Sequence, residues 1–110
     1  MKQKMTTKAV KTYFRNIHQA CYCELATLLR YVEPVGYTSG KYGWNYDIYA
    51  VNGVTICTGY RNMPGVRVKQ ATEYENKARA IADDYTIDYD SRKAQIMDLL
   101  EQFCKINGGY

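Results

Sequence analysis

The dipeptide Asn52-Gly53 constrains this chain more than any other feature of its sequence. It joins two runs rich in aromatic and β-branched residues, and Asn-Gly between such runs is the strongest short-range signal for a β-hairpin. A two-residue turn also fixes which residues face each other across the two strands. The expected opposite pairs are Val51 with Val54, Ala50 with Thr55, Tyr49 with Ile56, Ile48 with Cys57, Asp47 with Thr58, Tyr46 with Gly59, Asn45 with Tyr60 and Trp44 with Arg61.

Before the hairpin, apolar residues recur every three or four positions, which is typical of one face of an α-helix. These residues are Val10, Phe14, Ile17, Cys21, Leu25, Leu28 and Val32. We expect a long helix from Thr6 or Thr7 to about Tyr31, with the threonine as its N-cap. Glu33-Pro34 should end it, because the residue before a proline avoids the helical region.

Two further helices are expected after the hairpin. The run 72–75 has the form of a capping box, in which Glu75 bonds back to the Thr72 cap. The helix that it opens should end near Asp84, and a last helix should follow with Asp88 or Asp90 as its cap. The apolar faces of the two helices are Tyr74, Ala78, Ile81 and Tyr85, and then Ile96, Leu99, Leu100 and Phe103.

We also expect a third strand over about 35–39 beside the hairpin, and a short edge segment over 66–69. The predicted fold class is therefore α+β: a long N-terminal helix, a small antiparallel sheet built on the hairpin, and two C-terminal helices. The helices should cover one face of the sheet only. With 110 residues the chain has room for a single domain, residues 1–110.

No stretch resembles a transmembrane helix, and the N-terminus lacks the apolar core of a signal peptide, so we expect a cytoplasmic protein. The net charge of +4 is unevenly distributed. Residues 1–30 carry six Lys or Arg against one Glu, whereas residues 71–110 carry five against eight acidic residues. Such asymmetry could orient the protein on a charged partner.

Four lysine and arginine residues line one side of the first half of the expected N-terminal helix. They are Lys4, Lys8, Lys11 and Arg15, at steps of four, three and four. Most charge runs of this kind are solvated faces. Aligned cations also suit a contact to phosphates or to an acidic protein, and four charges do not decide between these interpretations.

Twelve tyrosines in 110 residues is a high proportion. Tyr and Trp together with Arg, Gly and Asn form the mixture that binding hot spots favour, because a rigid ring supplies a large contact area for little lost entropy. The open end of the hairpin should gather the aromatic and polar residues that we predict to form a binding surface. They are Tyr37, Tyr42, Trp44, Tyr60, Arg61 and Asn62. Stacking on nucleobases or on a ligand ring would use the same side chains.

Catalytic and metal-binding patterns fit poorly. Residues 36–41 have three residues between the glycines where a phosphate loop needs four, and the chain has one histidine and no recognisable nucleophile with its base. The four cysteines are expected to be reduced. His18, Cys21 and Cys23 lie close in sequence, and a zinc site that adds Cys57 or Cys104 stays open, although the spacing matches no common zinc module. We expect no enzyme, no metal and no cofactor.

The strings Tyr42-Gly43-Trp44-Asn45-Tyr46-Asp47-Ile48-Tyr49 and Thr58-Gly59-Tyr60-Arg61, with the Pro64-Gly65 turn, resemble small uncharacterised proteins of phages and conjugative elements from Gram-positive gut bacteria. The resemblance covers roughly residues 36–108 and brings no catalytic residue with it. It implies an inhibitor of host defence, anti-CRISPR proteins among them, or a regulator of the element, by association alone.

The leading expectation is a non-enzymatic inhibitor that blocks a host CRISPR-type nuclease complex through protein–protein contact inside a bacterial host. One alternative is a small nucleic-acid-binding regulator that uses the basic residues on the backbone and the aromatic residues on bases. The other is a protein that sequesters a nucleotide or another small molecule. Oligomeric state is not decided by the sequence.

Overall fold

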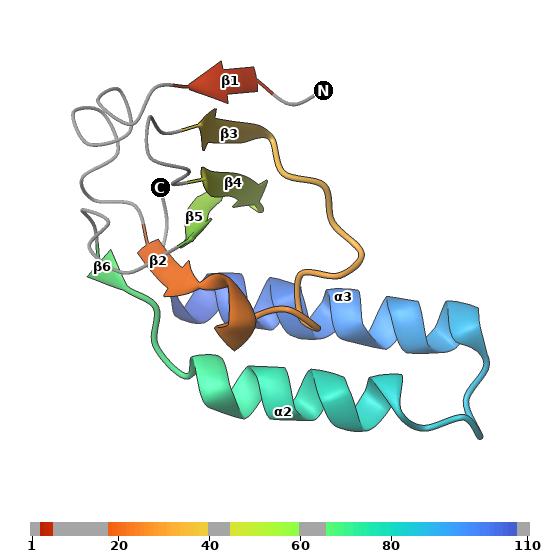
Figure 1. The fold of residues 1–110 in the computed structure, drawn as a ribbon. Coiled ribbons are helices and arrows are strands. Elements are labelled where there is room, and N and C mark those ends of the chain that lie inside the picture. Colours follow the sequence, from red (N-terminus) through yellow and green to blue (C-terminus); the bar gives the residue numbers. More distant parts are fainter. Residues whose placement is uncertain (1–2, 6–17, 40–44, 60–65, 108–110) are drawn as a thin grey trace.

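A computed structural model of the chain describes residues 3–5, 18–39, 45–59 and 66–107. Its described elements are six strands, a short 3-10 helix and two α-helices (Figure 1). In chain order they are β1 Gln3–Met5, β2 His18–Cys21, η1 Tyr22–Glu24, β3 Gly36–Ser39, β4 Asn45–Val51, β5 Val54–Gly59, β6 Val66–Arg67, α2 Ala71–Ala82 and α3 Tyr89–Ile106. The strands form one sheet in the order β1-β3-β4-β5-β2-β6.

The central hairpin is confirmed. β4 and β5 pair in antiparallel register, with Val51 opposite Val54 and each pair predicted as far as Asp47 opposite Thr58. Asn52 and Gly53 both adopt positive φ, 50° and 77°. A primed two-residue turn needs this geometry at both positions, and Asn and Gly tolerate it better than other residues.

The expected antiparallel sheet is wrong, because the observed sheet is mixed. β3 pairs with β4 antiparallel, as predicted for a third strand over 35–39. However, β1 is parallel to β3, and β2 is parallel to both β5 and β6. Among the described strands β4 alone runs against the others. The prediction failed because no local pattern indicated the strands β1 and β2 before the hairpin.

The long N-terminal helix is also wrong over residues 18–31, and its expected start at Thr6 or Thr7 lies outside the described residues. β2, η1 and a series of turns occupy this part of the chain. In a helix, the N–H groups of Thr27 and Leu28 would donate to carbonyls four residues earlier. Here both donate to the carboxylate of Glu75, 48 and 47 residues away. Within residues 18–39, one turn of this apolar pattern keeps a helical bond, in which Leu29 N–H donates to Leu25 O at 2.9 Å.

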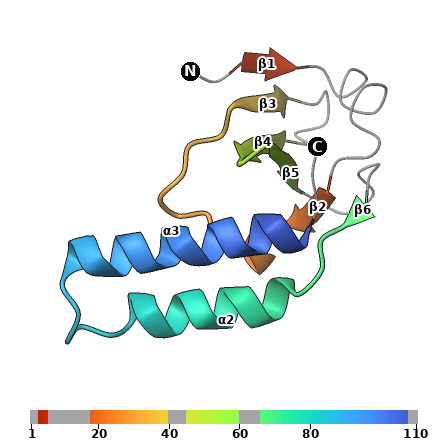
Figure 2. The same ribbon diagram turned by 180° about the vertical axis from the view of Figure 1, so that it is seen from behind.

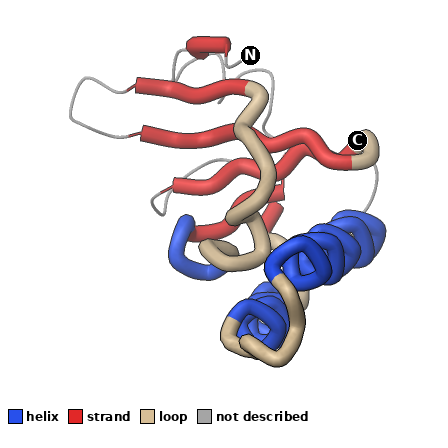
Figure 3. Tube along the Cα trace, turned by 90° about the vertical axis from the view of Figure 1, so that its right-hand side faces the viewer, coloured by secondary structure: helices blue, strands red, loops and turns tan. Residues whose placement is uncertain are grey.

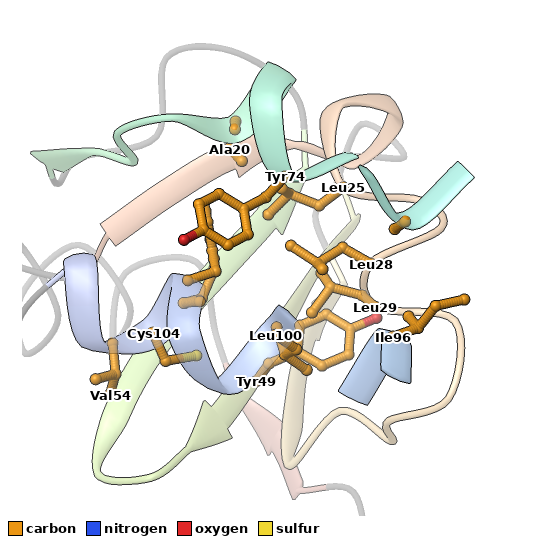
Figure 4. Close-up of a cluster of buried hydrophobic side chains, with 14 residues drawn as sticks. Ala20, Leu25, Leu28, Leu29, Tyr49, Val54, Tyr74, Ile96, Leu100 and Cys104 are labelled. Atoms are coloured by element: carbon orange, nitrogen blue, oxygen red, sulfur yellow. The ribbon is translucent and has the colours of Figure 1, made fainter. Parts of the chain in front are cut away.

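The two C-terminal helices are confirmed, and both lie on one side of the sheet (Figures 2 and 3). One buried cluster joins them to the hairpin and to the turn after η1, with side chains from all three parts pointing toward one another (Figure 4). Its main members are Ala20, Leu25, Leu28, Leu29, Tyr49, Val54, Ile56, Tyr74, Ala78, Ile96, Leu100, Phe103 and Cys104. On the other face of the hairpin Ile48 and Cys57 are buried as well.

The predicted capping box of α2 is wrong. The N-cap position belongs to Gln70, which has a φ of 60° and makes no side-chain capping bond. Glu75 is 3% exposed and accepts N–H groups from the turn that follows η1, at 2.9–3.1 Å. The Nε of Arg79 lies 3.2 Å from the same carboxylate. Glu75 therefore fixes the turn over residues 25–31 to α2 rather than capping its own helix.

The ends of α3 are fixed by side chains. Asp88 caps the start by accepting the N–H of Ser91, as one of the two predicted caps. At the other end, buried Asn107 accepts the N–H of Lys69 at 2.7 Å and donates to the carbonyl of Phe103 at 3.0 Å. This amide ties the end of α3 to the segment between β6 and α2.

Neither described helix combines the length and hydrophobicity that a bilayer crossing demands.

Replacing Glu75 with alanine should lower the free energy of unfolding by about 3 kcal/mol, because it leaves two buried N–H groups without an acceptor. Urea denaturation followed by circular dichroism would measure the loss. Glu75→Gln should lower the free energy of unfolding by less, since one oxygen acceptor remains.

Glu73→Ala is the matched control. Glu73 lies on the same helix and forms an exposed i,i+4 ion pair with Lys77, so its loss should cost no more than about 0.5 kcal/mol. Equal losses in Glu73→Ala and Glu75→Ala would contradict the anchoring role of Glu75.

Candidate binding surface at the carboxyl end of the sheet

The direction of the strands defines one distinctive end of the sheet. β1 is parallel to β3, and β4 runs antiparallel to both β3 and β5, so β4 begins at Asn45 on the side where β1, β3 and β5 end. We refer to this region as the sheet's carboxyl end; the arrowheads of β1 and β3 point toward it in Figure 1.

Two of the residues predicted to bind are neighbours here. Lys4, from the predicted basic face, is the register partner of Tyr37, from the predicted aromatic surface. Tyr37 in turn pairs with Asp47, and Asp47 with Thr58. The side chain of Tyr37 is half-buried. The basic and aromatic groups were predicted as separate features. In the structure, strand β1 places Lys4 of the basic group next to Tyr37 of the aromatic group.

The other predicted site residues lie outside the described residues and stay predictions. They are Tyr42, Trp44, Tyr60, Arg61 and Asn62 from the aromatic group, and Lys8, Lys11 and Arg15 from the basic group. The described residues that adjoin them in the chain can be placed, however. Met5, Ser39, Asn45 and Gly59 all lie at the sheet's carboxyl end. The segment between Ser39 and Asn45 leaves and re-enters the sheet at this end, whereas the chain after Met5 and after Gly59 returns at His18 and Val66, the first residues of β2 and β6.

Burial keeps the Tyr49 hydroxyl and the Cys57 and Cys104 thiols protonated. Burial, with a smaller contribution from the charge of Asp47, raises the pKa of Tyr49 to about 12 and that of the Cys57 thiol to about 12. Burial and the nearby Glu101 carboxylate raise the pKa of Cys104 to about 11. At neutral pH these thiols are therefore protonated and poor nucleophiles.

The residues considered for zinc are not arranged as the sequence suggested. His18 and Cys21 lie on β2 and Cys23 on η1, not on one helix. The pKa of His18 is lowered by burial and by the charge of Lys69. All four cysteines are free thiols, with Cys23 exposed. Within the described ranges, no group of three or more His, Cys, Asp or Glu residues could hold a metal ion.

One surface feature was missed by the sequence reasoning. Tyr85 was expected on the apolar face of α2, but the helix ends at Ala82 and the Tyr85 side chain is 82% exposed. Tyr89, in the first turn of α3, is 57% exposed. The predicted helix end near Asp84 already lay before Tyr85, and the acidic pair Asp83-Asp84 agrees with it, since acidic residues are unfavourable at a helix C-terminus; placing Tyr85 on the apolar face was therefore wrong.

The thiols should differ sharply in reactivity. Native protein treated with iodoacetamide at pH 8 should be alkylated at exposed Cys23, while buried Cys57 and Cys104 should react only at the rate of global unfolding. Peptide mass spectrometry would locate the labels. Protein labelled in urea is the control, because all four cysteines should react there; rapid labelling of Cys57 in native protein would contradict its placement between the strands.

Comparisons with protein-family models, with curated proteins and with solved structures found no match to this chain, so its function is argued from its own residues.

Proposed function

We propose that this chain is a non-enzymatic binding protein of a mobile element, which inhibits a CRISPR-type nuclease complex in the cytoplasm of a bacterial host by protein–protein contact. The sheet's carboxyl end is the contact surface in this proposal. The resemblance to phage and conjugative-element proteins supports the choice of target, and the arrangement of the sheet supports the choice of surface.

The pairing of Lys4 with Tyr37 carries the proposal. A cation and an aromatic residue on neighbouring strands match the composition of interface hot spots, where rings supply contact area and cations supply orientation. The segments with the remaining predicted aromatic and basic residues follow β1, β3 and β5 in the chain. A partner that contacts Lys4 and Tyr37 would therefore meet one member of each predicted group.

The protonated thiols favour binding over chemistry at this part of the molecule. Cys57 lies on β5 beside Asp47, but a pKa of about 12 leaves it without a useful thiolate fraction at neutral pH. Tyr49 is held in its neutral form in the same way. These side chains support the sheet by packing.

A nucleic-acid-binding regulator is the second candidate, and the same neighbouring pair favours it. A lysine beside a tyrosine can contact a phosphate and stack on a base. The two candidates differ in how binding responds to salt. Contacts to phosphates release counterions, so binding of nucleic acid falls steeply as salt rises.

The inhibitor proposal is tested by affinity capture of the defence complex from a host that carries it, with the full chain as bait. Tyr60→Ala and Arg61→Ala should each reduce recovery roughly tenfold, as expected for hot-spot residues. Tyr37→Phe should retain recovery, because the ring and its packing remain. Nuclease activity of the recovered complex should be suppressed in proportion to the amount of bait bound.

Lys77→Ala supplies the control, since Lys77 is an exposed cation on α2 that pairs with Glu73. Unchanged recovery with Tyr60→Ala and Arg61→Ala would contradict a contact through these two residues. Gel retardation of single- and double-stranded DNA and RNA at low salt, abolished at moderate salt, would favour the regulator instead.

A further inference from the structure

A second exposed surface lies where α2 connects to α3. Residues 83–90 form this connection and the first turn of α3, and we call them the helix tip. The helix tip lies at the end of the two helices away from β6, opposite the direction in which β1 and β3 point (Figures 1 and 2). It is therefore remote from the sheet's carboxyl end.

The two tyrosines of the helix tip are held in place although they are exposed. The guanidinium of Arg92 lies 4.8 Å from the ring centroid of Tyr85, and its Nη1 donates to Ala82 O at 3.1 Å. Tyr89 makes an edge-on contact with Tyr31, with 5.9 Å between ring centroids. Exposed rings that are already ordered lose little entropy when they bind a partner.

Acidic residues outnumber basic ones around these rings, although Arg92 lies over the Tyr85 ring and Lys93 over the Tyr31 ring. Residues 83–90 contain four aspartates and no Lys or Arg. Hydrogen bonds from Thr86 lower the pKa of Asp84, and hydrogen bonds from Ser91 lower the pKa of Asp88. These two carboxylates have local roles, in a turn and in a helix cap, so they alone indicate no partner. The ordered tyrosine rings beside them are the feature that suggests one.

We propose that the helix tip docks an arginine- or lysine-rich segment of a partner protein. Arginine on the partner can lie over the open part of the Tyr85 ring, which is 82% exposed, and pair with the neighbouring carboxylates. Negative potential around the rings attracts a basic segment and repels an acidic one or a nucleic acid. This proposal stands independently of the proposed function, because it uses another surface and other residues.

The experiment is a titration of the isotope-labelled full chain with an eight-residue peptide that alternates arginine and alanine, followed by amide chemical shifts. Shifts should concentrate in residues 83–92 and weaken as salt rises. Tyr85→Ala should bind the peptide roughly tenfold less tightly, as expected for a lost cation–π contact and its packing. Tyr85→Phe should bind almost as well as the wild type, because the ring remains.

Two controls make the result decisive. Tyr22→Ala removes a ring that is 59% exposed outside the helix tip, and it should leave binding unchanged. A peptide that alternates glutamate and alanine should cause no shifts. If Tyr85→Ala disturbs the fold, Asp90→Asn provides the second variant, since it removes one charge and no ring, and it should weaken binding. Shifts spread evenly over Glu73, Glu101 and the helix tip, or unchanged affinity in Tyr85→Ala and Asp90→Asn, would overturn the proposal.

Discussion

The carboxylate of Glu75 is the interaction on which the arrangement of this chain depends. It accepts the N–H groups of Thr27 and Leu28 inside the protein, and so holds the turn over residues 25–31 against α2. Leu25, Leu28 and Leu29 of that turn complete the core between the hairpin and the helices. A buried carboxylate is costly unless its acceptors are filled, and Arg79 supplies the balancing charge. One side chain thus links the segments before and after the hairpin.

Local signals predicted the elements that local interactions stabilise. The Asn52-Gly53 turn, the third strand and the two C-terminal helices followed from turn chemistry, alternation and helical period. The structure of the segment before the hairpin did not follow from these signals, because its apolar period fits one short turn as well as a long helix. Whether Thr27 donates its N–H within a helix or to Glu75 is decided by a contact across 48 residues, which no local pattern contains.

The candidate site was predictable in its parts but not in its assembly. The sequence identified a basic group and an aromatic group, and treated the first as the side of a helix. Strand β1 instead pairs Lys4 directly with Tyr37. That neighbourhood depends on parallel pairing between strands far apart in the chain, and such pairing leaves no short-range signature. Tyr85 was misplaced for a related reason, since α2 stops before the apolar period does.

The two surfaces can act independently because of their separation. The described chain extends 45 × 25 × 23 Å, with the helix tip and the sheet's carboxyl end at opposite sides of the fold. Charges interact over about 8 Å at physiological salt, so a partner at one surface barely changes the potential at the other. A basic segment drawn to the helix tip would therefore leave the Lys4–Tyr37 region free for a second contact. The uneven charge of the sequence would then orient the chain between two partners rather than select a single one.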